Sequence, residues 1–179
     1  MATVFSHALL GITAARAAYP DDRHFSIATW AAILAILPDL DVLGFAFGIR
    51  YGDFFGHRGF SHSLVFAFAL SVLVVAARFR EIPLGTGGLG LTVFFFLVTA
   101  SHGVLDAMTN GGLGIAFFSP FETSRYFLPW TPLQVSPIGA GFFSIEGLEV
   151  LGNEALWIGL PCAILFAARH ARNARSKRL

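Results

Sequence analysis

Long apolar stretches separated by short polar segments dominate the chain. Five such stretches cover residues 3–18, 26–49, 62–78, 88–108 and 154–169, and most charged residues and prolines lie between them. Lipid offers no hydrogen-bond partner for backbone amides, so apolar segments in a membrane must be helical or shielded by protein. Several are shorter than the ~20 residues that cross a bilayer comfortably. The pattern therefore predicts an all-α, polytopic membrane bundle of about four to five short or tilted helices.

Two of these stretches contain residues that shape the expectation. Pro38 lies inside the second stretch, where its ring removes a backbone donor and clashes with the preceding turn, so we expect that helix to break there. The first stretch shares an apolar core with a signal peptide, but its first basic residue, Arg16, follows the apolar region instead of preceding it. We therefore expect residues 3–18 to form a retained helix.

Composition agrees with a membrane environment. Hydrophobic residues make up 55% of the 179 residues and charged residues 13%, and the mean hydropathy is +0.69. No polar linker divides the sequence, so we expect residues 1–179 to form one domain. The net charge of +1 gives no basic surface for nucleic acid, which is not an expected partner. Cys162 is the single cysteine and is expected to pack inside an apolar helix.

The basic residues predict how the helices are oriented. If the helices alternate in direction, nine basic residues fall on one side of the membrane: Arg16, Arg23, Arg78, Arg80, Arg169, Arg172, Arg175, Lys177 and Arg178. Because basic residues concentrate on the cytoplasmic side, we expect a multi-pass protein of a bacterial-type inner membrane with residues 170–179 as a cytoplasmic tail. The long segment 109–153 is then non-cytoplasmic, and membrane lipids are the expected partners.

The same alternation brings seven polar residues towards the non-cytoplasmic side. They are His7, Asp39, Asp41, His57, His62, His102 and Asp106. Ionisable groups among apolar helices cost about 2.5–3.5 kcal/mol each on insertion scales, so their clustering indicates pairing, a water-filled cavity or a bound ion. A divalent metal satisfies all of these conditions. The sequence therefore predicts a metal site near one face of the bilayer.

Two short motifs hold carboxylates at informative spacings, one of them together with a histidine. His102 and Asp106 are four residues apart, which places them on one face of a helix, where they either share a metal or form a structural hydrogen bond. Asp39 and Asp41 point to the same side if the backbone between them is extended. A metal ion would relieve the repulsion between these carboxylates. The alternative is a helix-end cap with one solvated aspartate.

The segment GHRGFSHS is the richest in chemistry. His57 and His62 reach a common metal if the turn between them folds back. Arg58 then stabilises developing negative charge on a phosphoryl or carboxylate group, a task suited to its planar fork of donors. The alternative for Arg58 is pairing with Asp53. Ser61 is a natural N-cap for the helix that follows.

Five motifs follow one another along the chain: SHALLG, LPDLD, HRGFSHS, SHGVLDAMTNGG and FFSPFETSRYF. Together they resemble the YdjM-like family of membrane-bound, predicted metal-dependent hydrolases, and the resemblance covers most of the chain. The activity of that family is inferred from a His- and Asp-rich pattern similar to that of helical zinc-dependent phospholipases C. The resemblance implies candidate metal ligands at His7, Asp39, His57, His62, His102 and Asp106, with Asp41, Arg58, Ser61 and Thr109 nearby.

Three functional hypotheses follow. The first is a hydrolase that cleaves a phosphoester or related bond in a lipid-like substrate, using two or more divalent ions, with zinc or manganese suited to the mixed ligands. In that reaction Asp41 is the candidate general base and Arg58 the candidate anion stabiliser. The second is a metal-ion or proton transporter, and the third a non-catalytic protein with a structural metal. A serine hydrolase fits less well, because the sequence lacks a Gly-x-Ser-x-Gly elbow. The role of Glu122, which follows the SPF motif, stays open.

Overall fold

The part of the chain that the structure describes is helical. The computed structural model describes residues 1–20, 25–82 and 85–176. In chain order its elements are α1 (Val4–Ala18), α2 (Phe25–Ile36), the 3₁₀ helix η2 (Leu37–Phe47), the 3₁₀ turn η3 (Phe60–His62), α3 (Leu64–Arg78), α4 (Thr86–Ala107), the 3₁₀ turn η4 (Gly139–Phe143), α5 (Ile145–Glu154), the π-helical turn η5 (Ala155–Gly159) and α6 (Leu160–Ser176). The all-α prediction is confirmed.

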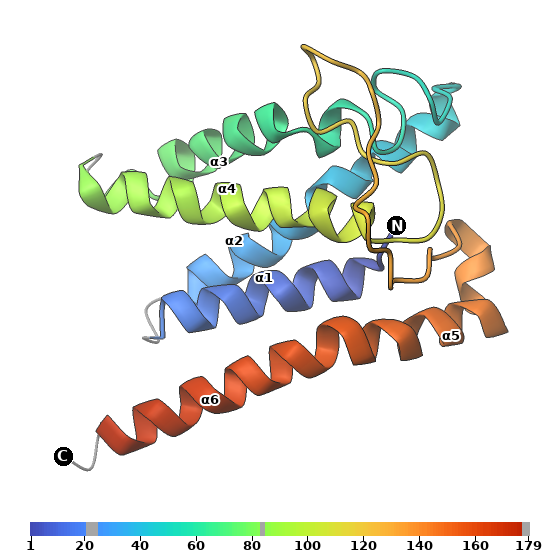
Figure 1. Cartoon of the computed structure of the whole chain (residues 1–179). Coiled ribbons are helices and arrows are strands. Elements are labelled where there is room, and N and C mark those ends of the chain that lie inside the picture. The colour runs from blue at the N-terminus through green and yellow to red at the C-terminus, as the bar shows by residue number, and fades with distance from the viewer. Residues whose placement is uncertain (21–24, 83–84, 177–179) are drawn as a thin grey trace.

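Helices α1 to α4 run back and forth along one direction (Figure 1). Within the described residues, three segments are long and apolar enough to cross a membrane, namely Ser26–Phe47, Thr86–Ala107 and Ile145–Arg169. Helices α1 and α3 contain 15 residues each, and a helix of that length extends only about 22 Å, less than the ~30 Å hydrocarbon core. The fold is therefore a helical membrane bundle that includes short helices, as the hydropathy pattern predicts.

Close packing between small residues holds α1 against α2. A Cβ atom added to Gly11 of α1 would lie 2.7 Å from the carbonyl oxygen of Ala31 in α2, so no larger residue fits there. Next to this contact, Leu34, Leu91 and Phe95 are buried and join α2 to α4. Because lipid tails are as apolar as these side chains, association in the membrane depends on such close packing.

At Pro38 the α-helix gives way to a 3₁₀ helix, and the helical segment as a whole continues. Helix α2 stops at Ile36, and the chain continues directly as η2, because the proline ring is incompatible with an α-helical bond to the preceding turn. A 3₁₀ helix has about three residues per turn, so residues two apart point in different directions. Asp39 and Asp41 are therefore not on one side of an extended segment, and they join different groups of side chains.

The last helix is longer than its apolar stretch. Elements α5, η5 and α6 continue from residue 145 to residue 176, so the predicted start at residue 154 is wrong by nine residues. Helix α6 lies beside α1 (Figure 1). Glu154 is buried, and its carboxylate accepts hydrogen bonds from the amide and hydroxyl of Thr3 and from the hydroxyl of Ser6, at 2.5–2.6 Å. These bonds join the C-terminal helix to the start of α1.

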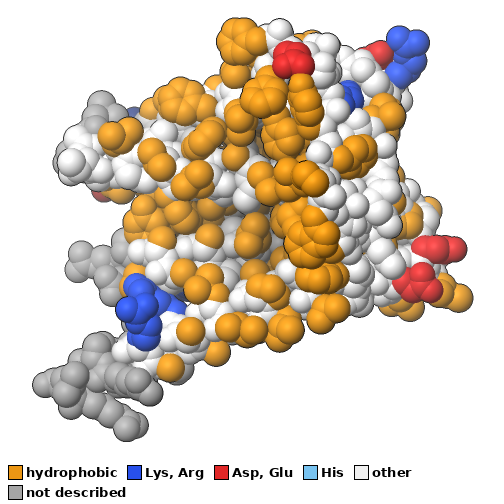
Figure 2. All heavy atoms as spheres, in the orientation of Figure 1, with side chains coloured by type: hydrophobic (Ala, Val, Ile, Leu, Met, Phe, Trp, Pro, Cys, Tyr) orange, Lys and Arg blue, Asp and Glu red, His pale blue; other side chains and the backbone are white. Residues whose placement is uncertain are grey.

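Apolar side chains cover much of the outer surface, and charged side chains gather near the ends of the bundle (Figure 2). The exposed apolar residues include Phe68 on α3, Leu97 on α4 and Phe166 on α6. Such a surface suits contact with lipid tails. The polar residues predicted as a metal site lie at the end where α1 begins and α4 ends.

Candidate metal centre

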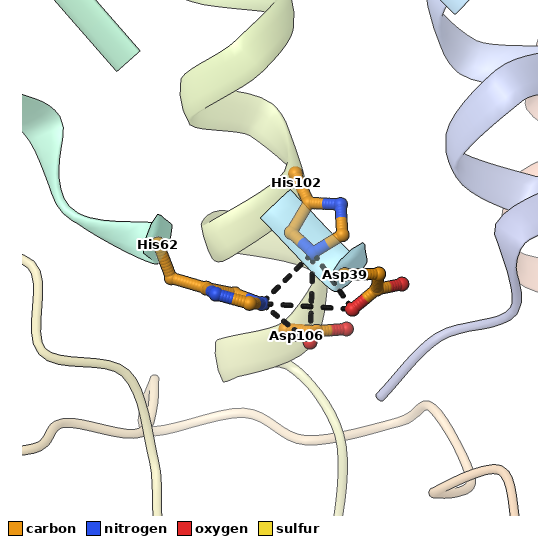
Figure 3. A group of neighbouring side chains, drawn as sticks. All are labelled: Asp39, His62, His102 and Asp106. Carbon is orange, nitrogen blue, oxygen red and sulfur yellow. Dashed lines mark hydrogen bonds and ion pairs between the residues drawn. The ribbon is translucent and has the colours of Figure 1, made fainter. Parts of the chain in front are cut away.

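Four side chains converge at the end of α4 (Figure 3). Asp39 comes from η2, His62 from η3, and His102 and Asp106 from α4. The Nε2 atoms of the two histidines lie 3.0 Å apart, and each lies 3.3–3.9 Å from one oxygen of Asp39 and one of Asp106. All four residues are at most 4% exposed. We call these residues the four-donor group.

The four-donor group fits a divalent metal ion. Zinc lies about 2.0–2.1 Å from nitrogen and oxygen ligands in a tetrahedral site, which places neighbouring donors about 3.3–3.4 Å apart. The measured separations of 3.0–3.9 Å bracket that value. Both carboxylate oxygens of Asp39, and Oδ2 of Asp106, are buried without a hydrogen-bond partner among the described residues. Buried polar atoms in that state are costly, and a bound cation would satisfy them.

His7 lies directly against this group. Its ring stacks on that of His102, with centroids 3.8 Å apart and planes inclined by 21°. Its Nε2 atom lies 3.4 Å from Oδ1 of Asp106, which also accepts a hydrogen bond of 2.6 Å from the amide of Ala2. Neither ring nitrogen of His7 has a hydrogen-bond partner in the described ranges. His7 is therefore available as a further ligand.

Asp41 belongs to a second group on the other side of His62. Its carboxylate lies 2.7 Å from Nδ1 of His57 and 3.2 Å from Nδ1 of His62. It also accepts hydrogen bonds from the hydroxyl of Ser61 at 2.5 Å and the amide of Arg58 at 3.2 Å. The spacing of this second group would also allow a metal ion. Because both Asp41 oxygens already have hydrogen-bond partners, the group fits better as a network that orients a metal-binding histidine.

His62 links the two groups through its two ring nitrogens. Nε2 faces the four-donor group and Nδ1 faces Asp41. Burial alone would lower the pKa of His62, but the carboxylates of Asp39 and Asp41 outweigh it and raise the pKa to about 9 in the metal-free protein. Below this pKa both ring nitrogens carry a proton, so an ion that binds Nε2 must displace the proton there.

Arg58 is buried behind Asp106. Its Nε atom lies 3.4 Å from Oδ2 of Asp106, Nη1 donates to the carbonyl of Gly111 at 2.8 Å, and Nη2 donates to the hydroxyl of Thr109 at 2.9 Å. The side chain is fully buried. The backbone of Arg58 has a φ of 64°, a region that residues other than glycine rarely adopt. Such strain persists where surrounding contacts fix the residue, as they do here.

The alternative partner considered for Arg58 is engaged elsewhere. Asp53 is bound by Arg50, with Nη2 and Oδ1 3.0 Å apart at an exposed position. Pairing of Asp53 with Arg58 is therefore wrong. The reason is local, because a turn brings residues 50 and 53 together and the amide of Arg50 donates to the same carboxylate at 2.8 Å.

Neither Ser61 nor Glu122 has a place in the four-donor group. Ser61 does not cap the next helix: α3 begins at Leu64, and Ser63 is its N-cap, accepting a hydrogen bond from the amide of Phe66 at 3.1 Å. The Ser61 hydroxyl is used by Asp41 instead. Glu122 is exposed and accepts a hydrogen bond from the hydroxyl of Tyr126, so it is not part of the four-donor group.

Arg125 supports the site, although the sequence did not point to it. Its Nη1 atom donates to the carbonyl of His57 at 2.8 Å and its Nη2 atom to the carbonyl of Tyr51 at 3.1 Å. The loop that carries His57 is thus held by the segment that follows α4. The available signal was charge: Arg125 is one of only three basic residues on the predicted non-cytoplasmic side, within the apolar run SRYFLPW.

Comparison with known proteins places the chain in a family. Residues 1–175 match the family model described as YdjM inner membrane protein, a range that includes every residue of both groups. The chain is also similar to inner membrane protein YbcI of Escherichia coli (strain K12), at 40% identity over 134 residues that cover 74% of this chain and 76% of the relative. No solved structure matches the chain. With its membrane helices and its buried histidine–aspartate cluster, the protein belongs to the YdjM inner membrane protein family.

Proposed function

We propose that this protein is a membrane-bound, metal-dependent hydrolase that cleaves a phosphoester or related bond in a lipid-like substrate. The observation that supports it best is the four-donor group, where two imidazoles and two carboxylates converge and three carboxylate oxygens lack a hydrogen-bond partner among the described residues. Mixed donors of this kind suit zinc or manganese. His7 and the remaining oxygens of Asp39 and Asp106 offer ligands for a second ion.

The residues around the centre divide the work of the proposed reaction. A divalent ion held by the four-donor group would supply Lewis acidity, which polarises a phosphoryl group and lowers the pKa of water. Asp39 and Asp106 supply the negative charge that retains a cation. Arg58, the expected anion stabiliser, donates to Gly111 and Thr109 and lies beside Asp106. We therefore assign it a positioning role, in which it fixes the Asp106 carboxylate.

His57 is the proposed proton acceptor, with Asp41 behind it. The 2.7 Å contact between Nδ1 of His57 and Asp41 assigns the ring proton to Nδ1 and leaves the lone pair on Nε2. That Nε2 atom is buried and has no hydrogen-bond partner among the described residues. The His57 ring centre lies 5.4 Å from that of His62. Asp41, the general base expected from the sequence, then acts by orienting both histidines.

A lipid-like substrate is supported by the surface next to the centre. The helix η2 carries Asp39 inside the site and exposes Leu40, Leu43 and Phe47 on its outer side. A head group could therefore approach the centre while its acyl chains stay in the bilayer. Since the four donors are nearly fully buried, turnover requires a covering segment to move. The distribution of basic residues supports a centre on the non-cytoplasmic side.

A structural metal is the second candidate function. Four protein donors can fill a tetrahedral coordination sphere and leave no open position for substrate. The burial of the four-donor group, at most 4% exposed, favours this reading. In that case the ion would join η2, η3 and α4 without taking part in chemistry.

A hydrolysis assay separates the two candidates. Purified protein loaded with Zn²⁺ or Mn²⁺ is incubated with a panel of phospholipids, and released head groups are measured. If the protein is the proposed enzyme, a chelator should abolish turnover. Asp106→Asn should also abolish turnover, whereas Asp53→Asn should retain it. Asp53 is a matched control because it is an exposed carboxylate bound to Arg50, outside the centre. If the parent protein binds metal and its Tm rises, but it shows no turnover, the result would contradict the hydrolase proposal and favour a structural metal.

A further inference from the structure

A cavity lies between the C-terminal part of α1 and the middle of α6. It has a volume of about 300 Å³ and is lined by Thr13, Arg16 and Pro20 on one side and by Leu165, Phe166 and Arg169 on the other. Arg16 lies nine residues beyond His7 on α1, about 13 Å further along the helix axis. The cavity is therefore separate from the metal centre.

The cavity combines two cations with apolar walls. Arg16 and Arg169 are partly buried, and the Nε atom of Arg169 is buried without a hydrogen-bond partner among the described residues. Among the described residues, no acidic side chain forms an ion pair with Arg16 or Arg169. A guanidinium group held against apolar surface is stabilised when an anion accepts its hydrogen bonds. The side chains thus favour an anionic ligand with an apolar part.

The position of the cavity matches the edge of the hydrocarbon layer. Arg169 is the last residue of the candidate span Ile145–Arg169, and Arg16 lies in the last turn of α1. Figure 2 shows basic side chains at this end of the molecule, next to the apolar band of the helices. Lipid phosphates lie at this depth, where basic side chains at the end of a membrane helix meet them.

A neighbouring groove offers room for the apolar part of such a ligand. It has a volume of about 330 Å³, runs between α1 and α2, and is lined by Ile12, Ala28, Ile33 and Ile36. Arg16 lines this groove as well as the cavity. A phosphate at Arg16 would therefore lie where an acyl chain has an apolar groove to follow.

We propose that Arg16 and Arg169 form a binding site for the phosphate group of an anionic phospholipid, at the end of the bundle opposite the metal centre. Each guanidinium presents paired donors that match phosphate oxygens. The apolar walls and the adjoining groove favour a lipid over free inorganic phosphate. The site would fix α6 to α1 through a bound lipid at the membrane edge.

Native mass spectrometry of the full-length protein tests this site. The protein is mixed with phosphatidylglycerol or with phosphatidylcholine in detergent, and bound lipid is counted. We expect Arg16→Gln/Arg169→Gln to weaken phosphatidylglycerol binding on the order of 10-fold or more, given two removed charges near the membrane surface. Arg172→Gln is the matched control, because Arg172 is an exposed arginine of α6 outside the cavity. That control should bind like the parent.

Two further measurements make the outcome decisive. The double Gln variant should keep the metal content of the parent, which shows that the bundle is folded, since the metal centre lies at the other end. Arg16→Lys/Arg169→Lys keeps both charges but loses the paired donors, so we expect binding between that of the parent and that of the Gln variant. An unchanged affinity in the double Gln variant, an equal loss in Arg172→Gln, or equal binding of inorganic phosphate and lipid would overturn the proposal.

Discussion

The imidazole rings of His7 and His102 are stacked, with centroids 3.8 Å apart and planes inclined by 21°. This contact joins the start of α1 to the last turns of α4 inside the candidate metal centre. The two residues are 95 positions apart in the sequence, so the stack exists only when both helices are in place. Substitutions at His7 can separate the contribution of the ring from that of its nitrogens.

We expect His7→Phe to keep most of the thermal stability and His7→Ala to lose about 1–3 kcal/mol, because phenylalanine preserves the stacked ring and alanine leaves a cavity. Thermal unfolding of metal-free protein in detergent measures both. Equal Tm values for the parent and both variants would show that the stack contributes nothing to stability.

Removal of a donor from the four-donor group should release bound metal. His102→Ala deletes an imidazole whose Nε2 atom lies 3.3 Å from Asp39 and 3.0 Å from His62. We expect its metal affinity to fall by more than the about 10- to 100-fold typical of changes in the second shell. Elemental analysis of purified protein and a competition titration with a chelator check this, and unchanged metal content would exclude His102 as a ligand.

Asp41→Asn should lower metal affinity less than the loss of a residue from the four-donor group does. Asparagine keeps the shape of Asp41 but not the charge that orients His57 and His62. We expect metal affinity to fall about 10- to 100-fold, while saturating metal still fills the site. Activity measured at saturating metal should remain reduced and should shift in pH dependence, because His57 would lose its partner. A loss of metal at saturation would instead identify Asp41 as a ligand.

Metal binding should strengthen as pH rises towards 9. The pKa of His62 is about 9 in the metal-free protein, so at pH 7 the ion must displace one proton from this residue. The apparent affinity should therefore increase by about tenfold per pH unit between pH 7 and pH 9 and level off above. Metal titrations at several pH values measure the slope. A flat profile over this range would show that metal binding displaces no proton from His62, which would contradict its role as a ligand.

Glu154→Gln should destabilise the bundle. The carboxylate accepts three short hydrogen bonds from Thr3 and Ser6 in a buried position, and an amide cannot accept all of them. We expect a loss of about 1–3 kcal/mol, in line with buried donors left without acceptors. Glu149→Gln is the control, because Glu149 is exposed on the same helix. A similar Tm for both variants would contradict the role given to Glu154.

Hydropathy was sufficient to predict that the apolar stretches are helical, because backbone groups in lipid must form hydrogen bonds within their own segment. It also predicted that His7, His62, His102 and Asp106 meet at one end, since antiparallel helices return to the same depth. It did not show how the two aspartates of the LPDLD motif divide between groups, because that depends on the 3₁₀ geometry that follows Pro38.

Side-chain contacts between distant segments were the least predictable feature. The apolar stretch begins only at Glu154, because more polar residues precede it, so hydropathy placed the start of the last helix there. The structure buries the Glu154 carboxylate against α1. Ser61 and Ser63 are equally suitable caps by type, but Ser61 binds Asp41 and Ser63 caps α3. Such choices depend on partners far away in the sequence.

The bonds between Glu154 and Thr3 connect residues 151 positions apart, which has a consequence for biosynthesis. A ribosome synthesises α1 to α4 before it reaches residue 154. Until then, nothing from the C-terminal helix can hold the first turn of α1, where His7 lies next to the histidines and aspartates. Insertion of the last helix is thus the step that fixes the centre, and a nascent chain stalled before residue 154 would carry every candidate ligand without the support of Glu154.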